Sequence, residues 1–482
     1  MKRERTLINI SKKTFIQVVI LLFALLVLSI VLTYIIPRGT FPRDPATGDI
    51  TDYNGYQPTD DGGIPLWKGL LAPVLVLTSN ISLIMLSLFL FVISATFQVM
   101  NDVGGIRSIV ESVASGRFRD RPALLLVLIS FLFYCFGSFL GLFEEMLTML
   151  PIVTALCVML GYDSFTGFIC CILACGFGFA GAITNPFTVL LASQIIDVNP
   201  MTGIWFRIVI FIVMFGLLLA FLFMYLKRIK ANRYDSLTYI HDTIYENEEK
   251  EESQPDTSET ARNPKLVRTM YSVFLLVSLA VIIVSSLLSS LRDYTVVILT
   301  AYFLIFGLLT GSIAAGSFRK AGKSFVNGIL GALPTLAFIA LAASVKYVLE
   351  EGHVLDTLVN QINNMINGGN VFLIALAIYL IVLVLEFFIS SSTAKAVLVM
   401  GILAMVFNSN PNLGLSKEML VLLYTFGDGY TNVIFPTSPV LLISLSMIGV
   451  NYLTWVKKSS LFFLVNFVLV VAFIALGVAV GY

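Results

Sequence analysis

Long apolar stretches recur along almost the whole chain, and most have the length that crosses a bilayer as a helix. A hydrocarbon core about 30 Å thick needs roughly 20 apolar residues in an α-helix. This criterion predicts nine spans, over residues 15–36, 69–98, 164–198, 203–226, 267–290, 294–316, 325–350, 418–450 and 459–481. Two further apolar stretches, 122–161 and 371–407, are interrupted midway by small or polar residues. The pattern predicts an all-α polytopic membrane protein.

The composition supports the same class of protein. Of the 482 residues, 58% are hydrophobic and only 12% are charged, whereas a soluble domain has about 25% charged residues. The formal net charge is +1, so no basic excess is available to neutralise a phosphate backbone. Soluble enzymes, disordered proteins and nucleic-acid binders are therefore poor fits, and the expected surroundings are a lipid bilayer.

The distribution of basic residues predicts the topology. If the spans alternate in direction, 22 of the 30 Lys and Arg residues fall on one side of the membrane. Because basic loops stay in the cytoplasm, the N-terminus is expected there and the C-terminus outside, in a multi-pass protein of the cell membrane. The number of membrane crossings agrees with this assignment only if 122–161 and 371–407 are re-entrant hairpins. The first hairpin would enter from the cytoplasm and the second from outside.

A charged, weakly apolar segment at residues 227–266 divides the chain. It is expected to be a solvated cytoplasmic linker, with a regulatory tail as the alternative. The first half, 1–226, contains the hairpin 122–161 and a broken helix at 164–198. The second half, 267–482, contains the hairpin 371–407 and a broken helix at 418–450.

The two halves share a pattern of motifs. Each has a polar hairpin tip, around Ser138 and Ser391, followed 47 and 46 residues later by Asn185 and Thr437 beside a proline. A Val-Leu-Leu-x-Ser sequence follows each proline, and the two copies are 251 residues apart. With hairpins entering from opposite faces, the halves are predicted to be inverted repeats, an architecture of secondary transporters.

Helix breaks at membrane depth persist only where they are buried or line a water-filled cavity. The helix N-terminal end at a break carries unpaired N–H groups and partial positive charge, which favours a carboxylate. The alternative is that the prolines merely kink packed helices. If the breaks instead form a site for a carboxylate, the candidate substrate-binding residues at the tips and breaks are Ser138, Asn185, Thr188, Ser391, Ser392, Thr393, Asn432, Thr437 and Ser438.

Ionisable residues within the apolar stretches form a second group of candidates, because each is costly to insert. They are Glu144 and Glu145 after the first tip, Lys395 at the equivalent place after the second, and Asp428 before the second break. Each is a candidate for pairing with substrate charge. A coupling ion, sodium or a proton, is a further possibility, with Thr184, Asn185 and Asp428 as cation contacts. The structural alternative is an internal ion pair, for example of Lys395 with Glu144 or with Glu386.

Sequence motifs give no support for an enzyme. Residues 176–181 match G-x-G-x-x-G but lie inside a span, where small residues favour close helix packing. No Walker, H-E-x-x-H or G-x-S-x-G sequence occurs. No cofactor and no resident metal are expected.

Five segments, in order, resemble the YfcC-like branch of the anaerobic C4-dicarboxylate carrier family. They are 137–145 (GSFLGLFEE), 184–188 (TNPFT), 390–396 (SSSTAKA), 426–429 (FGDG) and 436–438 (PTS), and residues 35–41 (IIPRGTF) are also similar. The resemblance implies the ion-transporter superfamily fold, with scaffold helices, paired re-entrant hairpins, commonly a homodimer, and an elevator motion. Phe435 and Pro439 depart from the pattern, at positions where a tyrosine and a small residue are usual.

These observations together predict a secondary active transporter, symporter or exchanger, for a small carboxylate-bearing metabolite, an amino acid or a dicarboxylate. The family includes carriers of dicarboxylates and of basic amino acids, so an arginine/ornithine exchanger is the specific alternative. A channel and a membrane-embedded enzyme are the other classes considered. The acids near the tips favour a zwitterionic or cationic substrate over a plain dianion.

Overall fold

The computed structural model describes residues 12–43, 51–52, 55–59, 62–79, 81–114, 120–243, 264–292, 294–357, 360, 370–389, 392–409 and 414–482. Nearly all of these residues are helical, and a short antiparallel pair of strands, β1 (Arg38–Thr40) and β2 (Gln57–Thr59), is the exception. Within this part of the chain, nine helices are long and apolar enough to cross a membrane. The prediction of an all-α polytopic membrane protein is confirmed.

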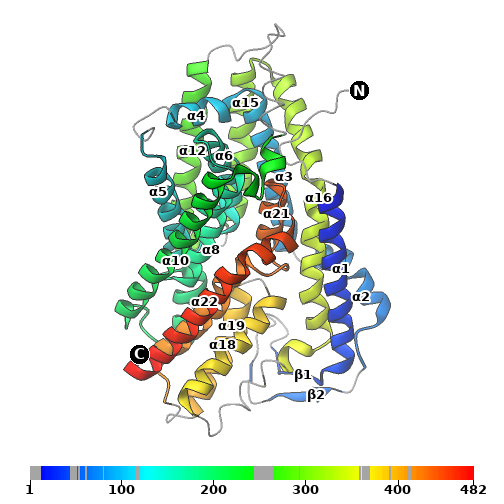
Figure 1. Ribbon diagram of the computed structural model, residues 1–482. Helices are drawn as coiled ribbons and strands as arrows, with labels where there is room; N and C mark the ends of the chain where they lie inside the picture. The colour runs from blue at the N-terminus through cyan, green and yellow to red at the C-terminus, as the bar shows by residue number, and fades with distance from the viewer. Residues whose placement is uncertain are drawn as a thin grey trace.

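One group of helices packs around the long helix α16, which runs along the right side of the molecule in Figure 1. Helices α1, α2, α3 and α15 all contact α16, and α12 packs on α4, α14 and α15. We call this set the α16 group, and we include in it the described residues that join α1 to α2 or directly follow α16, such as Arg43 and Asp356. Its members are α1 (Lys12–Ile35), α2 (Leu66–Ser79), α3 (Ile81–Asp102), α4 (Gly105–Ala114), α12 (Pro264–Leu287), α13 (Ser289–Arg292), α14 (Thr295–Tyr302), α15 (Leu308–Ala315) and α16 (Phe318–Glu351).

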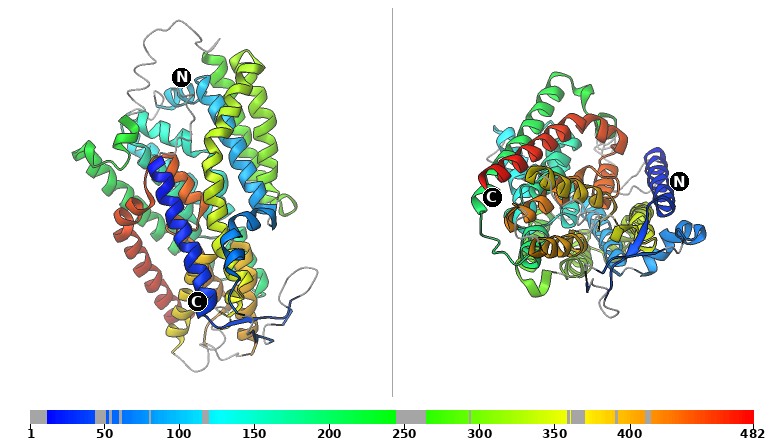
Figure 2. Two further views of the ribbon diagram at one scale, coloured as in Figure 1. Left: turned by 90° about the vertical axis from the view of Figure 1, so that its right-hand side faces the viewer. Right: turned by 90° about the horizontal axis from the view of Figure 1, so that it is seen from below.

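The remaining helices form a second body, which we call the broken-helix group. Its first part comprises α5 (Pro122–Cys135), α6 (Leu150–Met159), α7 (Ser164–Phe168), α8 (Ala174–Ala180), α9 (Leu191–Ile195) and α10 (Ile204–Ala231). Its second part comprises α18 (Val371–Phe388), α19 (Ser392–Ser409), α20 (Lys417–Asp428), α21 (Pro439–Met447) and α22 (Tyr452–Val480). The two parts interleave, since α22 packs on α10 and both α19 and α20 pack on α9. Figure 2 shows the helices from two further sides.

Six of the predicted spans, 15–36, 203–226, 267–290, 294–316, 325–350 and 459–481, coincide with long apolar helices. The prediction of one span over 69–98 is wrong, because this stretch is divided between α2 and α3. Helix α2 ends at Ser79 and helix α3 begins at Ile81. The sequence of residues 79–82, Ser-Asn-Ile-Ser, is made of residue types with lower helix propensity than leucine or alanine.

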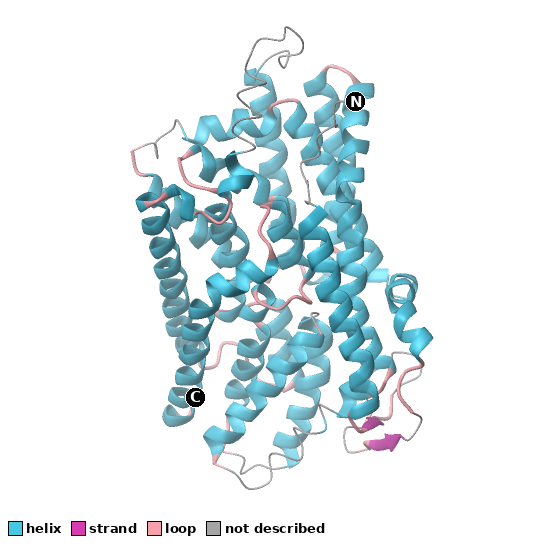
Figure 3. Ribbon diagram, turned by 45° about the vertical axis from the view of Figure 1, so that its right-hand side comes forward, coloured by secondary structure: helices cyan, strands magenta, loops and turns pink. Residues whose placement is uncertain are grey.

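The segments predicted to be interrupted are interrupted in the structure. Between α5 and α6 the chain forms a π-helical turn, η1 (Phe136–Leu140), a left-handed Gly141, and a 3₁₀ turn, η2 (Glu144–Thr148). The π-helical turn η3 (Ile169–Leu173) joins α7 to α8, and η4 (Pro186–Leu190) precedes α9 after a gap at 181–185. In the second half α20 stops at Asp428, a 3₁₀ turn η7 (Tyr430–Val433) follows, and α21 begins at Pro439. Figure 3 shows such non-helical stretches inside the helical body.

Proline and capping residues account for where the helices restart. Pro186 and Pro439 occupy the first turn after each break, where a missing N–H costs nothing. Asn185 and Ser438 are the N-cap residues, and each side chain accepts a hydrogen bond from a first-turn amide. The sequence therefore ends one helix and starts the next at each break.

Glycines allow α5 and α8 to approach closely. A Cβ atom on Gly178 would lie 2.2 Å from the Tyr134 carbonyl oxygen, and one on Gly137 would lie 2.0 Å from the Cys175 carbonyl oxygen. Both obstacles are backbone atoms, so a side chain could be accommodated only by separating the helices. This contact positions the first tip against the first break.

We predict that Gly178→Ala destabilises the protein by about 1–3 kcal/mol, the usual cost of overpacking. Gly216→Ala is the matched control, because Gly216 has open space around its Cβ position and alanine favours a helix. Thermal unfolding of the purified protein, followed by size-exclusion recovery, measures both. Equal melting temperatures for the two variants would contradict the assigned contact.

Candidate functional site

Ser138 joins the first tip to the first break. Its hydroxyl donates to the Gly181 carbonyl oxygen at 2.7 Å, and its carbonyl oxygen accepts the Ile183 and Thr184 amides at 3.1 and 3.3 Å. These groups would otherwise be unpaired backbone atoms within the membrane-spanning body. Ser138 is completely buried, so its position is that of a structural link between the two segments.

Asn185 makes the same connection from the other side. Its Nδ2 donates to the Gly137 carbonyl oxygen at 3.0 Å, while Oδ1 accepts the amides of Phe187 at 2.9 Å and Thr188 at 3.2 Å. Gly141, with φ of +68°, leaves the room that this side chain needs, since a Cβ there would lie 2.6 Å from Oδ1. The amide group of Asn185 is thus fully used inside the protein.

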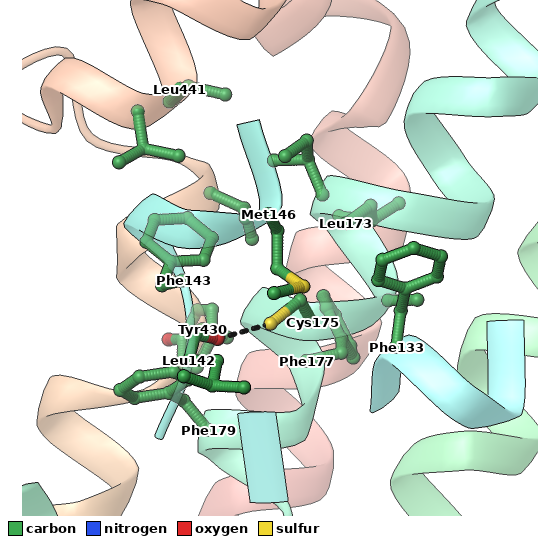
Figure 4. Packing of buried hydrophobic residues seen from close by; sticks show 14 of the residues in the cluster. Phe133, Leu142, Phe143, Met146, Leu173, Cys175, Phe177, Phe179, Tyr430 and Leu441 are labelled. Atoms are coloured by element: carbon green, nitrogen blue, oxygen red, sulfur yellow. Dashed lines mark hydrogen bonds between the residues drawn. The ribbon is translucent and has the colours of Figure 1, made fainter. Parts of the chain in front are cut away.

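The chain after Gly141 packs between the two halves. Figure 4 shows Leu142 and Phe143 beside α8, with Tyr430 of the second half close by. The Cys175 thiol donates to the Leu142 carbonyl oxygen, and the ring centroids of Phe143 and Phe179 are 6.0 Å apart. The first tip is therefore held by apolar packing as well as by hydrogen bonds.

A cluster of three charged residues lies at the second tip. Lys395, on α19, forms ion pairs with Asp428 at the end of α20, Nζ to Oδ1 2.7 Å, and with Glu386 on α18. Its Nζ also donates to the Ile389 carbonyl oxygen at 3.2 Å, and Ser392 Oγ donates to Asp428 Oδ2 at 2.9 Å. The exposed fractions of the three charged residues are 0%, 0% and 2% for Lys395, Asp428 and Glu386.

Of the interpretations considered for Lys395, the internal ion pair is the one that forms, whereas pairing with substrate charge stays a prediction. The internal pair with Glu386 forms, and Asp428 shares the same ammonium group. Two carboxylates and one ammonium leave a formal charge of −1 in a buried place. A buried ion group of this kind costs much desolvation energy, so its partners must remain together.

The second break is secured by different groups. Asn432 Nδ2 donates to the carbonyl oxygens of Asp428 and Gly429 at 2.9 and 3.3 Å. Trp455, on α22, donates its indole N–H to the Val433 carbonyl oxygen at 2.9 Å. The side chain of Asn432, one of the predicted binding residues, is thus engaged with the end of α20.

The two breaks cross each other. A Cβ on Gly429 would lie 2.6 Å from the Ala180 Cα atom, and one on Gly176 would lie 2.3 Å from a Val433 methyl group. The end of α8 therefore lies against the segment that follows α20. The helices that follow the breaks meet the opposite hairpin, since α19 packs on η4 and α9 and α21 packs on η2.

Two buried hydroxyl groups near the restarts have no hydrogen-bond partner among the described residues. They belong to Thr188, in the first turn after the first break, and Thr437, two residues before α21. Unpaired buried hydroxyls are rare in proteins, and each one invites a ligand or water. Among the predicted hydroxyl residues whose side chains the structure describes, these two have buried hydroxyls that bond to no described group.

Glu144 and Glu145 lie in η2, which contacts α21. Glu145 is almost completely buried, and one carboxylate oxygen accepts the Phe143 amide at 3.2 Å. Among the described residues, no Lys, Arg or His forms an ion pair with either glutamate. The first half therefore has two carboxyl groups without a described cationic partner after its tip. At the equivalent place after the second tip, the second half has the ammonium group of Lys395.

The remaining predicted residues fall as follows. Thr184 is partly exposed, with its hydroxyl 3.4 Å from the Phe139 carbonyl oxygen, and Ser438 caps α21. Ser391 and the side chain of Thr393 lie outside the described residues. Glu386 is the cluster member missing from the predicted site residues, although its charge inside an apolar stretch was the signal for it.

The helical body and its buried polar breaks define a multi-pass membrane carrier. A family model for the C4-dicarboxylate anaerobic carriers (DcuC) matches residues 15–479, and the chain belongs to that family. This membership makes the protein a transporter and not an enzyme.

Two relatives cover much of the chain. A protein of Escherichia coli (strain K12), provisionally named basic amino acid antiporter YfcC, is 26% identical over 77% of this chain and 72% of its own length. An uncharacterized protein of Haemophilus influenzae is 26% identical over 77% of this chain and 70% of its own length.

Two solved transporter structures are also similar. YdaH of Alcanivorax borkumensis matches with a TM-score of 0.40 and 14% identity, covering 95% of this chain and 98% of that one. MtrF of Neisseria gonorrhoeae, from work on antimetabolite efflux pumps, matches with a TM-score of 0.41 and 15% identity, covering 96% and 94%. At these low TM-scores neither likeness supports a further conclusion.

We predict that Lys395→Met strongly destabilises the protein, because it leaves two buried carboxylates without their cation. Breaking a buried ion pair in this way costs about 3–5 kcal/mol. Adding Glu386→Gln and Asp428→Asn to Lys395→Met should recover part of the loss. The control is Lys346→Met, since Lys346 is partly exposed and pairs with Glu350 on its own helix. Thermal unfolding in detergent measures all three, and equal effects of the two lysine variants would contradict the prediction.

Proposed function

We propose that the protein is a secondary active transporter of a small carboxylate-bearing metabolite, an amino acid or a dicarboxylate. The observations that carry this proposal are the crossing of two broken helices and the buried, unpaired hydroxyls of Thr188 and Thr437 at the two helix restarts. Helix restarts present first-turn amides and partial positive charge, which favour a carboxylate group. The threonine hydroxyls would add donors to the same carboxylate.

On this proposal Ser138 and Asn185 position the site and do not bind the substrate directly. Their polar groups are already bonded to the opposite segment, and breaking those bonds would expose backbone groups to the membrane interior. Thr184, Thr188, Thr437 and the first-turn amides are the groups left for the substrate.

A basic amino acid is the more specific alternative. Glu144 and Glu145 have no described cationic partner, and the cluster of Glu386, Lys395 and Asp428 has one negative charge in excess. An ammonium or guanidinium group on the substrate would compensate this charge. The name of the E. coli relative points to the same class of substrate. If the substrate is a dicarboxylate, a coupling cation, sodium or a proton, would instead compensate the excess negative charge.

Alternating access of the elevator type would move the broken-helix group along the α16 group. The surfaces between them are largely apolar, as in the space of about 20 Å³ that α3 shares with η2, α6 and α21, lined by Leu90, Ile93, Ser94, Phe97, Leu147, Pro151, Ile443 and Met447. The polar links described above lie inside one group or the other. A side-chain hydrogen bond between described residues, from Asn451 Nδ2 at the start of α22 to Gln17 Oε1 on α1, also joins the two groups and would have to break on sliding.

The function is tested by counterflow in proteoliposomes. Labelled arginine is offered to vesicles preloaded with unlabelled ornithine, and labelled succinate to vesicles preloaded with succinate. We expect saturable uptake, driven by the preloaded substrate, in one of the two assays. Uptake of arginine would mean that the acidic residues bind a cationic substrate. Uptake of succinate would mean that they bind a coupling ion. Uptake that does not depend on preloading would indicate a channel and contradict the proposal.

Asp428→Asn serves as the site-specific variant in this assay. Lys395 keeps Glu386 as its partner, so the variant should fold but lose uptake. Asp356→Asn is the matched control, because Asp356 is also buried but lies in the α16 group, paired with Arg43. Wild-type uptake by Asp428→Asn would remove this carboxylate from the mechanism.

We further predict that Thr188→Val and Thr437→Val each raise the KM for the substrate by roughly tenfold or more, the cost of a hydrogen bond to a charged group. Their melting temperatures should stay near that of the wild type, because neither hydroxyl is bonded within the protein. Thr335→Val, whose hydroxyl bonds to its own helix at Ala332, is the control and should leave KM unchanged. A stability loss without a KM change would assign the two threonines to structure alone.

A further inference from the structure

A groove separate from the breaks lies between the start of α5 and the end of α10. Its volume is about 260 Å³, and it is lined by Ala123, Tyr162, Phe223, Leu226, Lys227 and Lys230. Helices α5 and α10 are held together farther along by aromatic contacts, with the rings of Phe131 and Phe215 5.3 Å apart. The groove residues of the two helices lie at the start of α5 and near the end of α10.

The α10 wall of the groove changes character along the helix. Residues 223, 226, 227 and 230 have the spacing of one helical face. Phe223 and Leu226 make the first part of this face apolar, and Lys227 and Lys230 make the last turn basic. A ligand that fills the groove must therefore be apolar at one end and negatively charged at the other.

The charges of the two lysines are not paired with any carboxylate among the described residues. Arg228, between them, pairs with Asp235 at 3.3 Å, whereas no described carboxylate forms an ion pair with Lys227 or Lys230. The ammonium group of Lys230 lies 5.7 Å from the centre of the Tyr162 ring, and Tyr162 itself is buried. This contact holds one positive charge over the inner part of the groove.

Apolar surface continues from the groove along the membrane-facing side of the two helices. Leu124, Leu128 and Phe131 on α5 and Phe223 on α10 are each more than 40% exposed. These side chains form a track below the lysines, in the direction that acyl chains would take from a headgroup at the end of α10.

We propose that this groove binds an anionic phospholipid, with its phosphate at Lys227 and Lys230 and its acyl chains along α5 and α10. Basic pockets between helices at the membrane surface are suited to such headgroups, and lysine side chains reach them while their stems cover apolar surface. A free phosphate would use the lysines but not the apolar wall. The proposal does not depend on which substrate the protein carries.

Binding is tested on the full-length protein in mild detergent by native mass spectrometry, with phosphatidylglycerol, phosphatidylcholine or inorganic phosphate added. We expect the wild type to retain phosphatidylglycerol in preference to phosphatidylcholine and to show no adduct with phosphate. Lys227→Gln/Lys230→Gln should weaken phosphatidylglycerol binding roughly tenfold or more.

Lys457→Gln/Lys458→Gln is the matched control, because it removes two exposed lysines from the start of α22, away from the groove. It should retain phosphatidylglycerol as the wild type does. Equal retention of the two lipids by the wild type, or equal losses in both lysine variants, would overturn the site. Phosphate binding at the same lysines would show a free-anion site and overturn the lipid as occupant. Size-exclusion profiles and melting temperatures without added lipid establish that each variant is folded.

Discussion

The need to satisfy backbone polar groups away from water governs this structure. Where helices stop inside an apolar body, each free N–H or C=O group costs several kcal/mol unless the protein supplies a partner. At the first break Ser138 and Asn185 supply these partners, and at the second Asn432 and Trp455 do so. These partners come from a hairpin tip or from a neighbouring helix. The hydrogen bonds at each break therefore fix the position of that tip or helix relative to the break. Two interrupted helices can therefore cross at Gly429 and Ala180.

The charged cluster adds a second constraint of a different kind. Glu386, Lys395 and Asp428 come from α18, α19 and α20, so their mutual attraction ties the second tip to the end of the second broken helix. The first tip lacks such a cluster and relies on backbone hydrogen bonds and on packing around Phe143. The two tips are thus held by different chemistry. Negative charge is in excess at both: the cluster at the second tip has one carboxylate more than its ammonium, and Glu144 and Glu145 after the first tip have no described cationic partner.

Much of this arrangement could be predicted from the sequence, because the signals are local. Apolar length predicts most of the helices, and proline beside Asn, Thr or Ser predicts where two of them break. Apolar length did not predict the division between α2 and α3, because three polar residues in a long apolar run barely change its average hydropathy. The use of Ser138 and Asn185 as links could not be predicted either. Their partners lie more than 40 residues away along the chain, and a polar side chain does not reveal whether its partner is the protein or a ligand.

The hydrogen bonds and ion pairs described above distinguish the two groups of helices. Every break, tip and buried charge of the site belongs to the broken-helix group, whose segments are joined by hydrogen bonds and ion pairs that resist separation. The α16 group contains a 34-residue helix and its own polar links, such as Asp356 with Arg43 and Lys68 with Glu351. On the proposed elevator mechanism, the links inside each group favour displacement of one whole group along the other, and the hydrogen bond between Asn451 and Gln17 would break on the way. A motion of this kind would carry the site intact across the membrane, since no bond that builds the site would need to break.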